Sequence, residues 1–482
     1  MNKLFLIIIA TFGSLSCDKA TGDSPELTPA DYSGYPLVSA VHYRNGTATV
    51  GDLIPYYYNG EYHVFYLEGD EWAHIVSTDL LNWRVLPMAL LKGTSPTDPD
   101  HQGCWTGSVV EKDGVFHMFY TGKNSNDPLG EQKVMVAESR DRINWTKKPE
   151  RTFYADGTHY WNKTINGSID DKQRYHHQSF RDPHVFWNHE AKEWWMTLHA
   201  VKADGSRPVM SLHTSPDLYE WSVREPWVVY PSSISGDCPD AFYVNGKWNI
   251  NCANFVYMRV DGNVTTTDPR ILPFDCGDLC VPKTMYDGKR RILMGWITDY
   301  TGHTDSGDGG WGGIMSMPRE LYHDASGKPY QRPVEEILAV FSERIEGVST
   351  EVPSGTYIAA GLPVDFMFEA DIPATGRSIL RICQSQEDKE DGYYIEINTD
   401  KKRIYYGSPY RRFERNFTFD SAGPISVRWF VDGTVSECFV NDAYCFTMRS
   451  YDKPGSGFSF TSNDEQESMG NIKIFEKRDG IQ

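Results

Sequence analysis

A repeated group of strand-like segments restricts the fold of this chain more than any other feature. Its first copy, Gly51–Trp83, contains three short apolar runs separated by turn residues. Asn59-Gly60 joins the first two runs, and this dipeptide between β-prone runs is typical of a tight hairpin. The second apolar run of the group recurs around His63, His117, Trp195 and Trp248. Repeats of about 50 residues, each with about four strands, predict a β-propeller.

Five copies of the group occupy residues 36–337, so we expect a five-bladed β-propeller there. Two copies close on Ser-x-Asp-Leu-x-x-Trp, at Ser77–Trp83 and Ser215–Trp221, which favours a propeller over a generic β-sandwich. Residues 338–482 instead contain segments in which apolar and polar residues alternate, separated by turns about every 8–12 residues. This pattern predicts a C-terminal β-sandwich domain. The expected fold class is therefore all-β.

The first 17 residues have the features of a bacterial export signal. A lysine is followed by an apolar run, Leu4–Phe12, and then by small residues that end at Cys17. The run is too short to span a bilayer. We expect a lipoprotein-type signal peptide at 1–17, with ordinary secretion as the alternative, and a polar tether at 18–35. The protein would then cross the inner membrane and be held by a lipid on Cys17, in the periplasm or on the cell surface of a bacterium.

Charge and cysteine content narrow the possible ligands. The formal net charge of −19 disfavours nucleic acid and anionic membrane surfaces as partners. The cysteines beyond Cys17 show no paired metal-ligand spacing, so we expect neither a metal site nor a cofactor, and the disulfide pairing and oligomeric state stay open. Aromatic residues make up 13% of the chain, a content typical of β-rich proteins that stack rings on sugar faces.

Acidic and polar residues mark the start of the first strand in each copy. In a propeller these first strands line the central axis, so residues far apart in sequence converge at one mouth. The residues are Asp52, Trp105, Ser108, Arg181, Asp182, Asp237, Asp240 and Asp278. Clustered carboxylates with an aromatic rim favour glycoside hydrolysis, because that reaction needs one ionised and one protonated carboxyl group beside the bond. Each aspartate taken alone would instead be interpreted as a strand-end or turn residue.

Motifs in both regions resemble glycoside hydrolase family 32, the family of invertases, levanases and inulinases. In the propeller region they are Trp105–Ser108, Phe180–Pro183, Cys238–Asp240, Asp275–Asp278 and Met317–Leu321. In the last domain, Val431–Asp442 is similar to part of the family's C-terminal sandwich. The resemblance covers roughly residues 36–478 and implies a five-bladed propeller followed by a β-sandwich, in agreement with the repeat.

The resemblance also implies a reaction. Members of the family cleave β-fructofuranosidic bonds, as in sucrose and fructans, with retention of configuration. By this resemblance Asp52 would be the nucleophile, Asp182 the transition-state stabiliser and Asp237 the acid/base. The expected substrate-binding residues are Trp72, Trp105, Ser108, Arg181, Asp240, Asp278 and Trp311. The expected partner is an oligo- or polysaccharide substrate.

Some positions differ from the family pattern. Asp237 stands where the family has glutamate, so its side chain is one methylene shorter. Leu67 and Cys280 replace a polar and an aromatic residue of the family's pocket. Two alternatives therefore stay open: a propeller glycosidase for another furanoside or an unusual glycan, and a catalytically degenerate glycan-binding protein on the cell surface.

Overall fold

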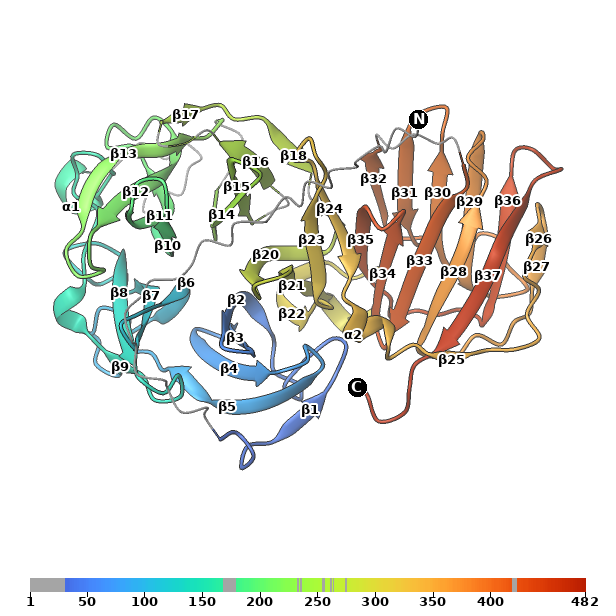
Figure 1. Cartoon of the computed structure of the whole chain (residues 1–482), viewed down its shortest axis with the longest axis horizontal. Coiled ribbons are helices and arrows are strands. Elements are labelled where there is room, and N and C mark those ends of the chain that lie inside the picture. The colour runs from blue at the N-terminus through green and yellow to red at the C-terminus, as the bar shows by residue number, and fades with distance from the viewer. Residues whose placement is uncertain are drawn as a thin grey trace, which may run out of the picture.

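The computed structural model describes residues 31–167, 179–231, 234, 236–253, 256–260, 262, 264–273, 275–417 and 423–482. Within these ranges the regular structure is almost all β, arranged as a propeller beside a sandwich (Figure 1), which confirms the expected fold class. The expected signal peptide, Cys17 and residues 18–30 of the expected tether lie outside the described residues. In the described ranges, no helix is both long and apolar enough to cross a bilayer.

Five sheets of the described residues surround the propeller axis (Figure 1). Blade one contains β1 (Leu37–Ser39), β2 (Gly51–Tyr58), β3 (Glu61–Glu68), β4 (Glu71–Ser77) and β5 (Asn82–Leu90). Blade two contains β6 (Gly103–Lys112), β7 (Val115–Lys123), β8 (Gln132–Ser139) and β9 (Thr146–Lys147). Blade three contains β10 (Phe180–Asn188), β11 (Glu193–Val201), β12 (Pro208–Ser215), β13 (Ser222–Val229) and β17 (Thr266–Thr267).

The remaining blades complete the ring. Blade four contains β14 (Asp240–Val244), β15 (Lys247–Cys252), β16 (Val256–Val260) and β18 (Ile271–Pro273). Blade five contains β20 (Leu279–Tyr286), β21 (Arg291–Tyr300), β22 (Gly309–Met315), β23 (Arg319–His323) and β24 (Pro329–Pro333). The short helical segments of the described residues are η1 (Pro149–Arg151), α1 (Lys163–Asn166), η2 (Thr301–His303) and α2 (Glu335–Leu338). The inner strands β2, β6, β10, β14 and β20 lie around the axis.

The sandwich consists of two sheets in the described residues. One contains β19 (Cys276–Gly277), β35 (Tyr444–Arg449), β34 (Val435–Val440), β33 (Ile425–Asp432), β28 (Phe366–Ile372), β37 (Ser468–Glu476), β25 (Glu343–Arg344) and β26 (Val352–Pro353). The other contains β27 (Thr356–Ile358), β36 (Gly457–Ser462), β29 (Arg377–Gln384), β30 (Tyr393–Asn398), β31 (Arg403–Gly407) and β32 (Arg412–Asn416). Buried residues from both sheets form one apolar core between them.

The Ser-x-Asp motif of the repeat forms the same turn in three blades. In blade one, Ser77 Oγ donates to Asp79 Oδ1 at 2.9 Å, and the same carboxylate oxygen accepts the backbone N–H of Asn82 at 2.8 Å. Ser139–Asp141 and Ser215–Asp217 make the equivalent contacts in blades two and three. In these three blades the serine and aspartate side chains accept hydrogen bonds from backbone N–H groups that have no partner in the sheet. The motif therefore stabilises the turn that follows the third strand of the blade.

The two domains share a strand pairing and buried charges. The short strand β19 comes before blade five in the chain, but it pairs with β35 of the sandwich, with Cys276 opposite Phe446. Buried Arg319 on β23 forms ion pairs with Asp275 and, at 2.9 Å, with Glu437 of the sandwich. Breaking a buried ion pair leaves an uncompensated charge, which costs about 3–5 kcal/mol. The propeller and sandwich are therefore joined by a buried, specific contact.

Candidate active site

A cavity of about 750 Å³ opens at one mouth of the propeller axis. One residue from the start of each blade lines it, and we call this set the front ring: Asp52, Thr106, Asp182, Cys238 and Val281. The inner strand changes register beside the front-ring residue in blades one, two, three and five. Bulges of this kind leave a residue outside the ladder and redirect its side chain, which is how an extended strand turns a residue toward the axis.

Three front-ring residues have left-handed backbone conformations. The φ angle is 64° at Asp182, 51° at Cys238 and 45° at Val281. A non-glycine residue in this region costs on the order of 1 kcal/mol or more, and such strain gathers at functional sites. The surrounding sheets therefore hold these residues in place against a local preference for other conformations.

Asp52 is surrounded by uncharged hydrogen-bond donors. Trp296 Nε1 donates to Asp52 Oδ1 at 3.0 Å, and Thr106 Oγ1 donates to Asp52 Oδ2 at 2.5 Å. The Cys238 thiol lies 3.6 Å from Asp52 Oδ2 and 3.4 Å from Asp182 Oδ2. Burial, helped by both carboxylates, raises the pKa of this thiol well above its usual value, so it stays a donor. These donors fix the orientation of the Asp52 carboxyl group toward the cavity.

Asp182 is buried and touches both Arg181 and Cys238. Its Oδ2 accepts the backbone N–H of Cys238 at 3.0 Å and lies 3.6 Å from Arg181 Nε. Burial raises the pKa of Asp182 to about 6; Arg181 opposes this rise, and the negative charges of Asp237 and Asp52 add to it. Asp182 therefore titrates close to neutral pH, unlike an ordinary surface aspartate.

Asp237 lies just before β14 and is the most exposed of the predicted catalytic aspartates, with 24% of its side chain accessible. Its Oδ2 accepts a hydrogen bond from Arg181 Nη2 at 2.8 Å. Its Oδ1 lies 3.1 Å from Nε2 of His199, a buried residue of β11. Arg181 thus connects Asp182 and Asp237, and all three side chains line the same cavity.

Aromatic side chains border the cavity. Trp105 Nε1 donates to Asp70 Oδ1 at 3.1 Å, and both residues line the opening. Trp311 on β22 is 52% exposed, and its ring lies over Gly51, next to Asp52. A Cβ atom at Gly51 would meet a ring carbon of Trp311 at 2.4 Å, so the absence of a side chain at Gly51 lets this ring lie at the rim.

Ser108 and Asp240, both expected to bind substrate, are not brought to this cavity. Each lies two residues beyond the front ring on its inner strand. Two residues of extended chain span roughly 7 Å, which moves the side chain toward the other end of the axis. Both residues line a second cavity at the opposite mouth.

Trp72 and Asp278 are also outside the front cavity. Trp72 is fully buried, and its Nε1 donates to the backbone oxygen of Trp105 at 3.1 Å, so it positions Trp105 instead of facing a ligand. Asp278 accepts hydrogen bonds from Tyr300 Oη and, at 3.1 Å, from the backbone N–H of Arg449 in the sandwich. Burial raises the pKa of Asp278 to about 6. Asp278 therefore connects the propeller to the sandwich.

The structure adds contacts that the sequence did not predict. Thr106 and Trp296 contact Asp52, Asp70 holds Trp105, and His199 contacts Asp237. Thr106 could have been found by aligning the repeats, because it occupies the position of Asp52 in blade two. His199 lies on a second strand, and no motif marks it. In the described parts of the chain, no group of His, Cys, Asp and Glu is arranged to hold a metal ion, and the cysteines there are free thiols.

Comparison with known proteins identifies the family. The model described as "Glycosyl hydrolases family 32 N-terminal domain" matches residues 54–333. This chain belongs to glycosyl hydrolase family 32. The model of the family 32 C-terminal domain matches residues 342–476, so both parts of this family 32 protein are accounted for.

Curated relatives of this family 32 member match it at low sequence identity. The cell wall isozyme of β-fructofuranosidase from Zea mays is 27% identical over 407 residues, covering 73% of this chain and 64% of that protein. Fructan 1-exohydrolase from Bromus pictus is 28% identical over 387 residues, covering 71% and 60%. The chain thus spans less than two thirds of the length of these relatives. The crystal structure of fructan 1-exohydrolase IIa from Cichorium intybus, at 18% identity, shares the fold with a TM-score of 0.73 over 93% of this chain and 99% of that one.

Proposed function

We propose that this family 32 member is a retaining glycoside hydrolase that acts on β-fructofuranosides, either fructans or sucrose-type substrates. Asp52 is the nucleophile, Asp182 stabilises the transition state and Asp237 is the acid/base. The observation that carries the proposal is the convergence of these aspartates, from separate blades, on one cavity bordered by Trp105 and Trp311. The relatives named as β-fructofuranosidase and fructan 1-exohydrolase support a fructoside substrate.

The surroundings of Asp52 suit a nucleophile. A retaining mechanism needs an ionised carboxylate that attacks the anomeric carbon and forms a covalent intermediate. Trp296 and Thr106 hold both oxygens of Asp52 by hydrogen bonds from neutral groups. Neutral donors orient the carboxylate without the strong pairing of a cation, so its negative charge stays available to the sugar.

Asp182 suits the role of transition-state stabiliser. Its ionised carboxylate would accept hydrogen bonds from sugar hydroxyls, and such bonds strengthen as positive charge develops on the ring. The raised pKa of Asp182, about 6, makes this role dependent on pH. Arg181 lies on one side of Asp182 and limits that rise.

Asp237 must give a proton to the leaving group and later take one from water. In the free protein, Arg181 Nη2 lies 2.8 Å from Asp237 Oδ2 and His199 Nε2 lies 3.1 Å from Asp237 Oδ1, so both oxygens of this carboxyl group are held in place. A bound sugar excludes water from the cavity, and the loss of solvation raises the pKa of a carboxyl group. Substrate binding therefore favours the protonated form that the first half requires.

The remaining cavity residues supply binding. Trp105 and Trp311 offer faces for sugar rings, and Asp70 offers an acceptor for hydroxyl groups. We also propose that the protein acts outside the cytoplasm, held by a lipid on Cys17. The support for this is the export-signal pattern of residues 1–17.

The direct test is fructose release from sucrose, 1-kestose, inulin and levan. The wild-type protein should release fructose from at least one of them, and methanol as acceptor should give the methyl β-fructofuranoside, which reports retention. Asp52→Asn should abolish release, whereas Asp113→Asn, a change at an exposed turn residue, should leave it intact. The proposal fails if none of the four substrates yields fructose, or if Asp52→Asn is as active as the wild type.

Two observations favour the alternative functions. Leu67 and Cys280 line the cavity and give it a less polar wall, which suits another furanoside or an unusual glycan. A glycan panel with activity only on fructans would exclude this alternative. Asp237 is short and already engaged by Arg181 and His199, which suits a glycan-binding protein without turnover. Calorimetric binding without hydrolysis would support that function, and any Asp52-dependent hydrolysis would exclude it.

A further inference from the structure

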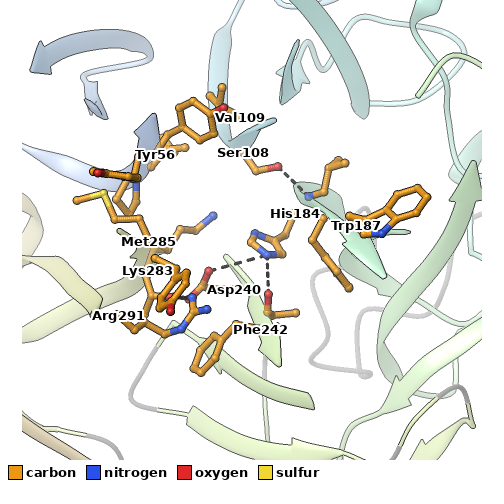
Figure 2. Close-up of a pocket in the computed structure, with 18 of the residues that line it drawn as sticks. Tyr56, Ser108, Val109, His184, Trp187, Asp240, Phe242, Lys283, Met285 and Arg291 are labelled. Atoms are coloured by element: carbon orange, nitrogen blue, oxygen red, sulfur yellow. Dashed lines mark hydrogen bonds and ion pairs between the residues drawn. The ribbon is translucent and has the colours of Figure 1, made fainter. Parts of the chain in front are cut away.

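A second cavity, of about 380 Å³, lies at the opposite mouth of the propeller axis (Figure 2). Each inner strand contributes the residue two positions beyond the front ring, and we call this set the rear ring: Ile54, Ser108, His184, Asp240 and Lys283. The volume falls within the range of small-molecule sites in proteins, about 300–1,000 Å³. The proposed hydrolysis uses none of these residues, so the rear cavity needs an explanation of its own.

Lys283 is the most unusual residue of the rear cavity. It extends from blade five across the axis to blade two, where its Nζ donates to the backbone oxygen of Gly107 at 2.9 Å. Lys283 is only 2% exposed, yet among the described residues no carboxylate forms an ion pair with it. Figure 2 shows the ammonium group pointing toward the middle of the ring of side chains. Burying a charge without a counter-ion is costly, and lysine is almost never fully buried unless it is paired.

The other charged groups of the rear cavity do not supply that counter-ion. Asp240 is engaged by other residues: Thr284 Oγ1 donates to Asp240 Oδ2 at 2.7 Å, and His184 Nε2 lies 3.9 Å from Asp240 Oδ1. Arg291 Nη1 donates to Thr284 Oγ1 at 3.0 Å. Burial lowers the pKa of His184 to about 4, so this imidazole is neutral at pH 7. Lys283 and Arg291 therefore outnumber Asp240 in the cavity lining, although the whole chain has a net charge of −19.

The opening of the rear cavity carries exposed aromatic rings. Trp187 is 44% exposed and Tyr286 is 55% exposed, and both line the cavity. Figure 2 shows Trp187 at the side of the opening and Arg291 across from it. Large rings left open to solvent beside buried polar groups suit a ligand with an apolar face and hydroxyl groups. A sugar ring has both.

We propose that the rear cavity is a binding site for an anionic saccharide, a mono- or disaccharide that carries one phosphate or carboxylate group. The anionic group would bind Lys283 Nζ and so supply the counter-ion that the protein does not provide. The sugar ring would pack against Trp187 and Tyr286, with its hydroxyl groups near His184 and Asp240. Asp240 would repel a ligand with several negative charges, which restricts the ligand to one anionic group.

Calorimetry with the full chain tests this site with four probes: glucose 6-phosphate, glucuronate, inorganic phosphate and glucose. At least one of the two acidic sugars should bind, and which of them binds distinguishes phosphate from carboxylate recognition. Lys283→Met should weaken that binding roughly 10- to 100-fold, because a hydrogen bond to a charged group is lost. Trp187→Ala should weaken it about threefold to tenfold through loss of ring contact.

Matched controls separate the rear cavity from the proposed active site. Lys289→Met, at an exposed lysine of the same hairpin, and Arg181→Met, at the cation of the front cavity, should both keep the wild-type affinity. If Lys283→Met does not fold, as judged by circular dichroism, Trp187→Ala decides, because its side chain is exposed. Binding that Arg181→Met abolishes, equal binding of glucose or inorganic phosphate, or no binding of either acidic sugar would each overturn the proposal. These outcomes do not depend on whether the protein hydrolyses fructosides.

Discussion

In every blade the front-ring and rear-ring residues are two positions apart in the chain, yet the two rings differ in chemistry. In the front ring, Asp52 and Asp182 are close to each other and are held mainly by uncharged donors. In the rear ring, the buried Lys283 donates to a backbone oxygen, that of Gly107, and Asp240 is engaged by Thr284. One set of strands thus builds an anionic site at one mouth and a cationic site at the other. The comparison shows that the position of a polar residue along its strand, and not its residue type, determines which of the two cavities it lines.

The largest expected effect separates a front aspartate from a rear one. Asp52→Asn removes the nucleophile and should lower kcat by roughly 10⁴-fold or more, because the asparagine amide does not form the covalent intermediate. Asp240→Asn should lower kcat/KM less than about tenfold, because it acts on the active site only through the fold. Fructose release under matched conditions measures both. A larger loss for Asp240→Asn than for Asp52→Asn would break the distinction between the rings.

The next effect concerns the acid/base. Asp237→Ala should lower kcat on a natural fructoside by about 10²- to 10⁴-fold, because no group protonates the leaving oxygen. On an aryl fructoside whose leaving group needs no proton, the loss should be clearly smaller. Comparing kcat on the two substrates measures the difference. An equal loss on both would show that Asp237 does not act as a general acid.

The pH dependence tests Asp182. Its pKa is raised to about 6, so the carboxyl takes up a proton as the pH falls through 6 and no longer accepts hydrogen bonds from the sugar. The value of kcat/KM should therefore fall about tenfold for each pH unit below 6. Arg181→Met should move the midpoint to higher pH, because Arg181 lowers the pKa of Asp182. Lys289→Met, on the surface, should leave the midpoint in place, and a profile without this acid limb would contradict the assignment.

The smallest expected effect concerns the rim. Gly51→Ala forces the ring of Trp311 away from its position beside Asp52. KM should rise about threefold to tenfold through the loss of a sugar-stacking face, with a smaller change in kcat. Gly470→Ala is a suitable control, because a Cβ there meets no other atom within 4 Å. Affinity at the rear cavity should not change, and a parallel loss at both mouths would show that the two sites are coupled.

The sequence predicted the blades because their determinants are local. Hairpin dipeptides, alternating apolar residues and the Ser-x-Asp turn each act over a few residues, so they can be read without knowing the fold. Asp52 and Asp182 were placed at the axis for the same reason. Ser108 and Asp240 line the rear cavity instead of the front one, because each lies two residues farther along the chain than the front-ring residue of its blade, and the sequence alone does not define this depth.

Contacts between residues far apart in the chain could not be predicted from the sequence. His199 meets Asp237 from the second strand of the preceding blade, and no motif links the two. Asp278 looked like an axial residue of blade five, but β19 pairs with the sandwich and draws Asp278 toward Thr447, whose oxygen accepts its backbone N–H at 2.9 Å. In each case a partner far along the chain determines the local environment.

The pairing of β19 with β35 also ties the assembly of the propeller to the completion of the sandwich. The segment that leads into the inner strand of blade five finds its partner only when Phe446 and Thr447 have been made. Domains usually fold in the order of synthesis, but here the ring closes late, and long-range pairing of this kind slows folding. A fragment limited to residues 36–337 would remove Glu437 and Thr447, which bind Arg319, and would uncover the face of the propeller that carries this arginine. The propeller is therefore expected to be a poor stand-alone folding unit, and activity to require both domains in one chain.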